Sequence, residues 1–321
     1  MTPRQVGLLG ALAALWGASY LLIKYALADF SPAAVVCLRT ALGAAVLYGV
    51  IRATAPEARA ALVQVRRRPG TALLFSSLAI AAPFLLIAIG ERRVPSGLTA
   101  VLIASAPLFV AVFAPFLDPA ESVGRRQGLG LVMGLGGVAL LVGVETIGTL
   151  AQFLSALGIV AAAACYSLST FMVRSAYRGV PSLATSFVSV CGGALLTLVP
   201  AALSPSRHWP HLRSVAALVI LGVAGTALAF VIFYRLIAEV GAGRASLVSY
   251  LVPPLSLAYG AILLAEPVTP AAIGGLALIL GGVGLASRAP APGPEGAEAI
   301  PAGDGPEEIP SAGAAPDSAP R

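Results

Sequence analysis

The sequence predicts an all-α integral membrane protein whose ten transmembrane helices form two inverted five-helix repeats. Three observations support this prediction: the composition, ten long apolar runs and an internal repeat. Of 321 residues, 58% are hydrophobic and 11% are charged, and the mean hydropathy is +0.92. A soluble globular domain carries roughly 25% charged residues. Lipid is therefore the expected solvent for most of this chain.

The apolar runs define the helices. A spanning helix needs about 20 mostly apolar residues. The predicted spans are residues 6–27, 33–51, 71–90, 96–117, 127–144, 152–173, 183–203, 214–236, 244–264 and 270–287. The connections are short, so consecutive helices are expected to pack antiparallel. The first run has no small-residue cleavage site, so we expect a spanning helix rather than a removed signal peptide.

Basic residues predict the orientation. The longest connection, residues 52–70, carries five arginines: Arg52, Arg59, Arg66, Arg67 and Arg68. Clustered Arg in a short loop stays cytoplasmic, which predicts cytoplasmic N- and C-termini in the cell membrane. Four arginines lie on the predicted outer side: Arg92, Arg93, Arg207 and Arg213. We give the five-Arg connection more weight.

The charge of the chain is divided unevenly. Residues 1–288 hold 19 Lys and Arg against 8 Asp and Glu, whereas residues 289–321 hold 1 against 6. A basic membrane region reflects cytoplasmic Arg rather than affinity for nucleic acid, so we expect no nucleic-acid partner. The segment 289–321 is rich in Pro, Gly, Ala and Glu and is expected to be a disordered cytoplasmic tail.

Cysteine usage predicts neither a metal site nor a cofactor. Cys37, Cys165 and Cys191 all lie in apolar runs, and none has the spacing of a zinc site.

An internal repeat divides the chain. The segment LWGASYLLIKYA (15–26) aligns with CYSLSTFMVRSA (165–176), 150 residues later. Three further matches follow at offsets of 145 or 146: Pro107 with Pro253, Glu121 with Glu266, and residues 136–138 with 281–283. The repeats are residues 6–144 and 152–287. Because each holds five spans, an odd number, the second enters the membrane from the opposite side. Inverted repeats are a recurring plan of secondary transporters.

Several segments resemble the EamA type of the drug/metabolite transporter superfamily. They are LWGASYLLIK in the first span, SPAAVVCLR at the second, APLFVAVFAPFL and GLGGVALL in the fourth and fifth, and VPPLSLAYGAILLAEPVTPAAIGGLALILGGVGLA near the end. The resemblance covers roughly residues 6–288. It implies a ten-helix carrier, often an exporter, of amino acids, metabolites, vitamins or nucleotide precursors, and it does not select among them.

Two matched stripes are candidates for a cavity lining. Trp16, Tyr20 and Lys24 recur every four residues and share one helix face. The repeat gives the sixth span three equivalent positions, Tyr166, Thr170 and Arg174. In the alternative interpretation the two basic side chains snorkel to the interface while the aromatic rings pack or anchor.

Arg39 lies about two turns into the second span, where a charge costs a few kcal/mol and usually signals function. It is expected to bind a substrate carboxylate, or to serve as a structural Arg on helix carbonyls or lipid phosphate, and Asp29 is a possible partner. Further lining candidates are polar or aromatic residues near span centres: Ser77, Phe84, Tyr234 and Tyr250.

Prolines and acids complete the candidate residues. Pro107, Pro253 and Pro254 lie inside predicted spans and are expected to kink them as hinges, unless the kinks serve packing alone. Glu121 and Glu266 lie at span ends, which favours capping over proton relay. No Asp or Glu lies near the centre of a predicted span, so the basic intramembrane charges favour a substrate with an anionic group.

We therefore expect a secondary transporter or facilitator that exports small organic solutes, namely amino acids or related metabolites, by alternating access. Drugs, vitamins or nucleotide precursors are the alternative substrates. An intramembrane enzyme would need a nucleophile, an acid/base pair or a metal motif, and neither GxSxG nor HExxH occurs; a receptor is equally remote. The expected partners are the lipid bilayer and a small-molecule substrate, for a monomer or homodimer.

Overall fold

The computed structural model describes residues 1–65, 67–117, 125–145, 149–204 and 209–286. Within these residues every regular element is helical, which confirms the all-α prediction. The predicted tail, residues 289–321, lies outside them, and the side chains at 145, 174, 234, 242 and 243 are likewise not described.

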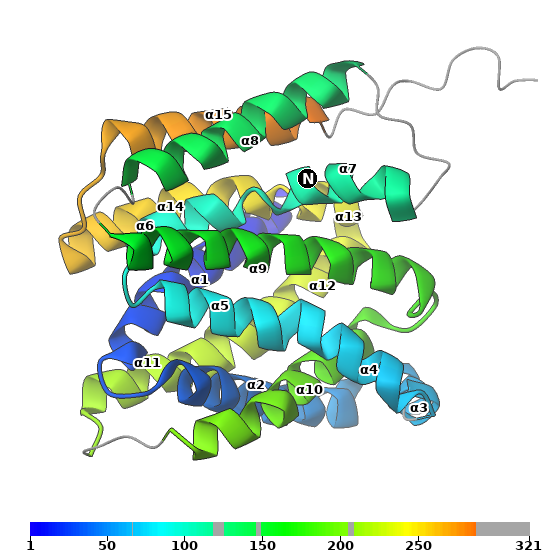
Figure 1. Cartoon of the computed structure of the whole chain (residues 1–321). Coiled ribbons are helices and arrows are strands. Elements are labelled where there is room, and N and C mark those ends of the chain that lie inside the picture. The colour runs from blue at the N-terminus through cyan, green and yellow to red at the C-terminus, as the bar shows by residue number, and fades with distance from the viewer. Residues whose placement is uncertain (66, 118–124, 146–148, 205–208, 287–321) are drawn as a thin grey trace, which may run out of the picture. The chain divides into compact units, whose positions relative to one another are not determined.

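The described helices follow one another with short connections (Figure 1). They are α1 (Pro3–Leu27), α2 (Pro32–Thr54), α3 (Pro56–Val65), α4 (Pro69–Ser76), η1 (Ser77–Ala81), α5 (Ala82–Gly90), α6 (Ser96–Ile103), α7 (Ala106–Leu117), α8 (Arg125–Glu145), α9 (Leu150–Ser175), α10 (Ser182–Ala202), α11 (Leu212–Gly222), η2 (Val223–Leu228), α12 (Ala229–Val240), α13 (Ala242–Ala245), α14 (Val248–Leu264) and α15 (Pro270–Ala286). The elements η1 and η2 are π-helical.

Eight helical segments in the described part of the chain are long and apolar enough to span a bilayer. They correspond to the first eight predicted spans. The last two predicted spans, 244–264 and 270–287, contain shorter apolar helices of 17 residues each, α14 and α15. At 1.5 Å per residue each rises about 25 Å, near the lower limit for crossing a bilayer. The chain is thus a multi-pass membrane protein, and its ten-span topology stays a prediction.

One connection and two spans differ from expectation. The Arg-rich connection is largely helix α3 rather than a loop, because Pro56 starts a new helix directly after α2 ends. The predicted span 96–117 is divided into α6 and α7, and the predicted span 244–264 into α13 and α14. Pro107 explains the first division, because it has no N–H group to donate a helical hydrogen bond to a carbonyl of α6.

Two π-helical segments interrupt the third and eighth spans, and they begin 146 residues apart at Ser77 and Val223. In η1 the N–H of Ala82 donates to the carbonyl of Ser77, five residues earlier. In η2 the Thr226 hydroxyl donates to the Leu221 carbonyl at 2.9 Å. π-helical turns often lie at functional sites.

Small residues let the helices approach closely. α8 and α15 lie side by side at the top of Figure 1. A Cβ added at Gly282 of α15 would lie 2.6 Å from the Gly130 carbonyl oxygen of α8. α1 is packed on two sides: a Cβ at Gly17 would meet Leu255 of α14 at 3.1 Å, and Gly225 of η2 lies against Ser19. This is the small-residue packing typical of membrane helices.

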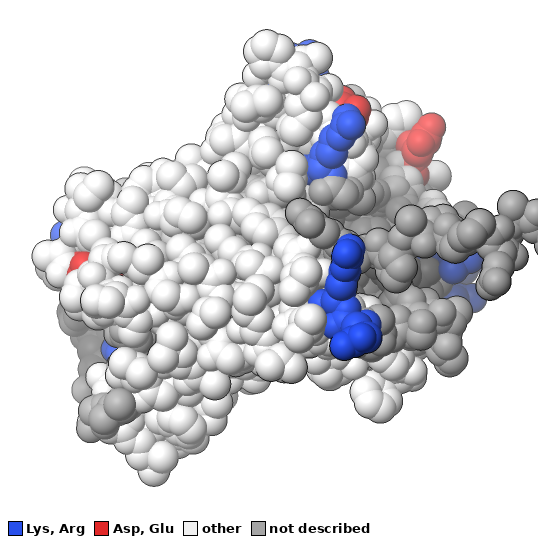
Figure 2. Space-filling view, turned by 90° about the horizontal axis from the view of Figure 1, so that it is seen from above, with Lys and Arg blue, Asp and Glu red and all other residues white. Residues whose placement is uncertain are grey.

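The surface agrees with a bilayer as solvent. Figure 2 shows, among the described residues, a broad face without Lys, Arg, Asp or Glu over the middle of the helices, with charges toward its two ends. Large hydrophobic side chains are exposed along the helices, including Leu129 and Val132 of α8.

Candidate binding site

Arg39 is the centre of the candidate site. Ser31 caps α2 through a hydrogen bond from the Ala34 N–H at 3.2 Å, and Arg39 follows two turns later. Its side chain is buried, with 6% of the residue exposed. Among the described residues, its Nε and Nη2 groups donate to a single oxygen, Thr226 Oγ1 of η2, at 3.4 and 3.2 Å. This guanidinium can donate five hydrogen bonds, so most of its capacity is unused by these contacts.

Aromatic residues surround the guanidinium. The Arg39 Cζ atom lies 4.2 Å from the centre of the Phe84 ring, a cation–π contact with α5. Tyr20 of α1 and Tyr166 of α9 lie within electrostatic range of the same guanidinium. We call these five residues, Tyr20, Arg39, Phe84, Tyr166 and Thr226, the central cluster. Four of them, Tyr20, Arg39, Phe84 and Tyr166, were predicted as site residues from four different spans, and the structure brings them together.

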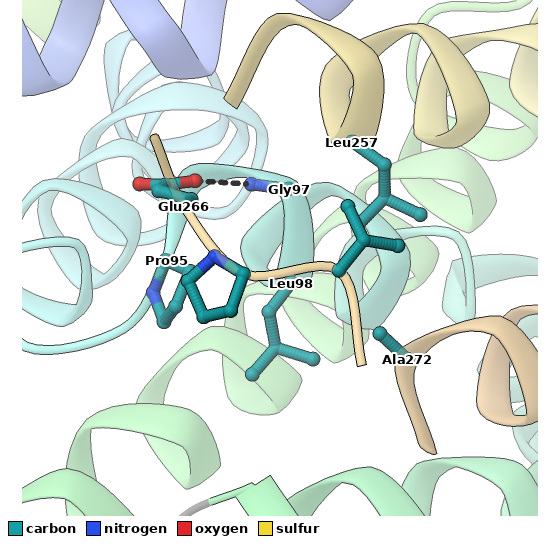
Figure 3. A pocket seen from close by; sticks show the side chains of 8 residues that line it. Pro95, Gly97, Leu98, Leu257, Glu266 and Ala272 are labelled. Atoms are coloured by element: carbon teal, nitrogen blue, oxygen red, sulfur yellow. Dashed lines mark hydrogen bonds between the residues drawn. The ribbon is translucent and has the colours of Figure 1, made fainter. Parts of the chain in front are cut away.

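Lys24 lies one turn beyond Tyr20 on the same face of α1 and forms an ion pair with Glu266, at 3.9 Å between Nζ and Oε1. Glu266 also accepts hydrogen bonds from the Ser96 N–H at 2.9 Å, the Ser96 hydroxyl at 2.7 Å and the Gly97 N–H at 3.3 Å. Figure 3 shows its carboxylate turned toward the Gly97 nitrogen. Glu266 therefore caps the first turn of α6, as the sequence suggested.

A residue with left-handed backbone conformation, Ala265, directs the following Glu266 toward α6. Ala265 ends α14 with φ 53°, a left-handed conformation that residues other than Gly rarely adopt. The N–H groups of Ala265 and Glu266 both donate to the Gly260 carbonyl. This tight reversal turns the chain back toward α6, so the Glu266 side chain reaches its N-terminus.

Glu91 is a buried acid that the sequence-based search missed. It is the residue directly after α5, one residue beyond the predicted span, and has no exposed surface. In the described structure neither of its carboxylate oxygens has a hydrogen-bond partner. Lys24, Glu266 and Arg39 lie within electrostatic range of it. No Asp or Glu lies near the centre of a predicted span, as the sequence indicates, but Glu91, one residue past a span end, is a buried carboxylate next to the basic centre of the site.

A cationic pocket opens beside Lys24. It has a volume of about 370 Å³ and is lined by Lys24, Tyr25, Ala28, His211, Arg213 and Ser214. The Arg213 guanidinium lies over the Tyr25 ring at 3.7 Å. The pocket of Figure 3, beside Glu266, has only about 10 Å³ and is the size of a water molecule. Of these two pockets, the larger has room for a small solute.

Asp29 does not pair with Arg39. It accepts a hydrogen bond from the His211 N–H at 2.7 Å and lies 3.0 Å from His211 Nδ1. It therefore links the α1–α2 connection to the start of α11 at the rim of the cationic pocket.

The remaining predicted lining residues also make contacts outside the central cluster. Trp16 packs against Phe230 and Phe233 of α12, with ring centres 6.3 and 5.2 Å away. Tyr250 packs against a separate core around Leu141 and Ile279.

Two polar candidates have different surroundings. Thr170 is exposed, and its hydroxyl donates to the Tyr166 carbonyl within α9. Ser77 is half-buried and starts η1. The Tyr234 and Arg174 side chains, and Glu121 entirely, lie outside the described residues.

The prolines have different local effects. Pro107 is the second residue of α7, directly after the break, and the Ser167 hydroxyl of α9 donates to the neighbouring Ala106 carbonyl at 2.6 Å. Pro253 and Pro254 lie inside α14, which continues through them, so they do not interrupt the helix assignment. Hinge motion at any of the three stays a prediction.

Thr226 was also missed, although a signal was present. It is the only polar side chain between Ser214 and Tyr234 in the eighth span. An isolated hydroxyl in a long apolar run indicates a partner on a neighbouring helix.

Comparison with known proteins places these features in context. The family model of the EamA-like transporter family matches residues 5–143 and 153–288. An uncharacterized transporter of Bacillus subtilis (strain 168), YoaV, is 24% identical over 274 residues, which cover 84% of this chain and 91% of the relative. A probable terminal-alkyne amino-acid exporter of Streptantibioticus cattleyicolor is 31% identical over 206 residues, covering 62% and 66% of the two chains.

A solved structure supports the fold. One crystal structure of a protein has a TM-score of 0.63 with this chain at 21% sequence identity. It covers 89% of this chain and 97% of its own.

Proposed function

The chain belongs to the EamA-like transporter family, and from this premise we propose that it exports amino acids or related metabolites whose carboxylate is bound by Arg39. Members of this family are transporters rather than enzymes, so a small-molecule substrate and a surrounding bilayer follow from membership. The substrate class, the site and the direction of transport are our proposal.

The observation that carries this proposal is the buried guanidinium of Arg39. Both of its hydrogen bonds to described residues go to one oxygen, Thr226 Oγ1. A carboxylate binds a guanidinium through two parallel hydrogen bonds, which are stronger than neutral ones. A substrate carboxylate would thus accept hydrogen bonds from the Arg39 N–H groups that the contacts with Thr226 leave unused.

The aromatic residues of the central cluster suit the rest of such a substrate. Phe84, Tyr20 and Tyr166 line the surroundings of the guanidinium with apolar ring surface and two phenol groups. Binding sites for small molecules are mostly apolar with a few polar groups that fix orientation. The relative described as a probable terminal-alkyne amino-acid exporter agrees with a carboxylate-bearing, partly apolar substrate.

We further propose that substrate moves by alternating access between two inverted repeats, residues 6–144 and 152–287. Two equivalent contacts support it. A Cβ at Gly43 of α2 would lie 2.8 Å from Thr226 in η2, and a Cβ at Gly193 of α10 would contact Ile80 in η1. The two glycines are 150 residues apart and their partners 146, matching the offsets of the sequence repeat.

In this mechanism the repeats rock around the central cluster, and Pro107, Pro253 and Pro254 are the proposed hinges. The protein lies in the plasma membrane with both termini cytoplasmic, as the Arg-rich connection predicts.

Ligand-dependent thermal stability of the purified full-length protein tests the proposed substrate class. A ligand that binds only the folded state raises its apparent stability. We expect amino acids to raise the melting temperature, and amines of the same side chain without the carboxylate to have little effect. Nucleosides, vitamins and organic cations cover the alternative substrates.

Two variants sharpen this test. Arg39→Lys keeps the charge but loses the two-pronged geometry, so the amino-acid shift should largely disappear. Arg126→Lys changes an exposed arginine at the start of α8 in the same way and should leave the shift intact. A shift produced only by organic cations, or one that is equal in Arg39→Lys, would contradict the proposal.

A further inference from the structure

Glu91 has surroundings that differ from those of its neighbouring acid. It has no exposed surface and no hydrogen-bond partner among the described residues. Glu266, by contrast, accepts three hydrogen bonds from the first turn of α6 and an ion pair from Lys24. The two carboxylates lie within electrostatic range of each other.

The Lys24 ammonium lies near both acids, Glu266 and Glu91. Lys24 is paired with Glu266 at 3.9 Å and also lies within electrostatic range of Glu91. An ionised carboxylate buried without hydrogen bonds costs several kcal/mol, and a protonated one avoids most of that cost. Backbone N–H groups donate to Glu266 and stabilise its ionised form. A single proton available to the two acids therefore binds to Glu91.

Charged or titratable groups face Glu91 from several elements. Tyr20 and Lys24 face it from α1, Arg39 from α2, and Glu266 from the connection before α15. From α9 the atoms nearest to the preceding Gly90 belong to Ile159 and to the Ser155 backbone. Arg39 contacts Thr226 and Phe84, whereas Lys24 already pairs with one of the two acids, so we take Lys24 as the cation that exchanges between them.

The cationic pocket reaches one member of this group, Lys24. Lys24 lines the cationic pocket of about 370 Å³, and its ammonium is the link between that pocket and the buried acids. The end of α5 and the start of α6 lie at the same side of the molecule as the end of α1, at the left of Figure 1.

We propose that Glu91 is the proton-binding group through which transport is coupled to a proton gradient. When the pocket is accessible, the Glu91 carboxylate accepts one proton and becomes a neutral acid, while Lys24 stays on Glu266. When the opposite side is accessible, the acid releases that proton and the ionised Glu91 is compensated by Lys24. One proton thus crosses against each exported substrate. The substrate in this scheme rests on the proposed function, but proton binding does not.

Infrared difference spectroscopy tests proton binding directly. The full-length protein in lipid is titrated from acidic to alkaline pH without substrate, and the C=O band of a protonated buried carboxyl is followed. We expect this band in the wild type and in Glu57→Gln, which changes an exposed acid on α3. It should be lost in Glu91→Gln, which keeps the shape of the side chain. A band that persists in Glu91→Gln would overturn the proposal.

Coupling is tested in proteoliposomes loaded with an equimolar mixture of the twenty common L-amino acids. With the side facing the pocket one pH unit more acidic, one-for-one exchange supports up to about a tenfold higher steady-state concentration ratio, since one pH unit is 1.36 kcal/mol. Wild type should respond, and Glu91→Gln should transport without responding. An equal response of the two proteins would contradict coupling through Glu91. If neither the wild type nor the variant transports any amino acid, the proposed function is wrong. The infrared band still shows whether Glu91 binds a proton.

Discussion

Three acids at one end of the helices show how local partners decide what a carboxylate does. Asp29 is fixed by His211, Glu266 caps α6, and Glu91 is buried without a hydrogen-bond partner among the described residues. The first two have structural contacts that explain them. The third has none, which is why we assign it a proton.

Asp29 gives a prediction about pH. A hydrogen bond from the Ser214 hydroxyl, followed by one from the His211 N–H, lowers the pKa of Asp29 to about 2. In the unfolded chain the pKa of an aspartate is about 4. Its contribution to stability is therefore present above pH 4 and is lost as the pH falls toward 2.

We expect the melting temperature of the wild type to fall more steeply between pH 4 and pH 2 than that of Asp29→Asn, measured by thermal unfolding in detergent. Glu57→Gln, on the exposed face of α3, should keep the wild-type slope. Parallel profiles for wild type and Asp29→Asn would show that these hydrogen bonds contribute little.

Sequence reasoning at this scale was limited by distance along the chain. Arg39 could be predicted because a charge deep in a span is energetically costly and usually has a function. Glu91 could not, because it follows the predicted span directly and is succeeded by Arg92 and Arg93, as in an ordinary exposed turn. Only the fold shows that its side chain points inward while theirs are exposed.

At the scale of elements, the α8–α15 pair depends on glycine. A Cβ at Gly282 would lie 2.6 Å from the Gly130 carbonyl oxygen, whereas a Cβ at Gly136 would meet no atom within 4 Å. We expect Gly282→Ala to destabilise the protein by about 1–3 kcal/mol, as overpacking does. Gly136→Ala on α8 should be neutral or stabilising, because Ala favours helix.

Unfolding of both variants under identical detergent conditions measures this difference. Equal stability of Gly282→Ala and Gly136→Ala would mean that the two helices separate readily and that their close approach contributes little.

Helices were easier to predict than their interruptions. Hydropathy predicted the long helices because a spanning segment must satisfy its backbone internally and face lipid. The division between α6 and α7 was signalled by Pro107. The π-helical turns η1 and η2 carried no comparable signal, because they depend on contacts with α10 and α2 from distant parts of the sequence. Helix α3 was missed because the arginines of the connection 52–70 were considered only as charges.

At the scale of the whole molecule, the proposed topology predicts which residues are reachable from each side. In a variant lacking Cys37, Cys165 and Cys191, a membrane-impermeant maleimide should label Arg93→Cys in intact cells. It should label Arg59→Cys only after permeabilisation. Both positions are exposed, so burial does not explain a difference. The reverse pattern would invert the orientation and put the cationic pocket on the cytoplasmic side.

The central claim is that Arg39 binds the carboxylate of an exported amino acid. Its most direct test is the efflux of labelled L-amino acids from proteoliposomes containing the full-length protein. Charge-assisted hydrogen bonds contribute roughly 1.5–3 kcal/mol, so Arg39→Ala should reduce efflux about tenfold or more. Arg126→Ala, which removes an exposed arginine, should match the wild type. Efflux by Arg39→Ala at the wild-type rate would contradict the account.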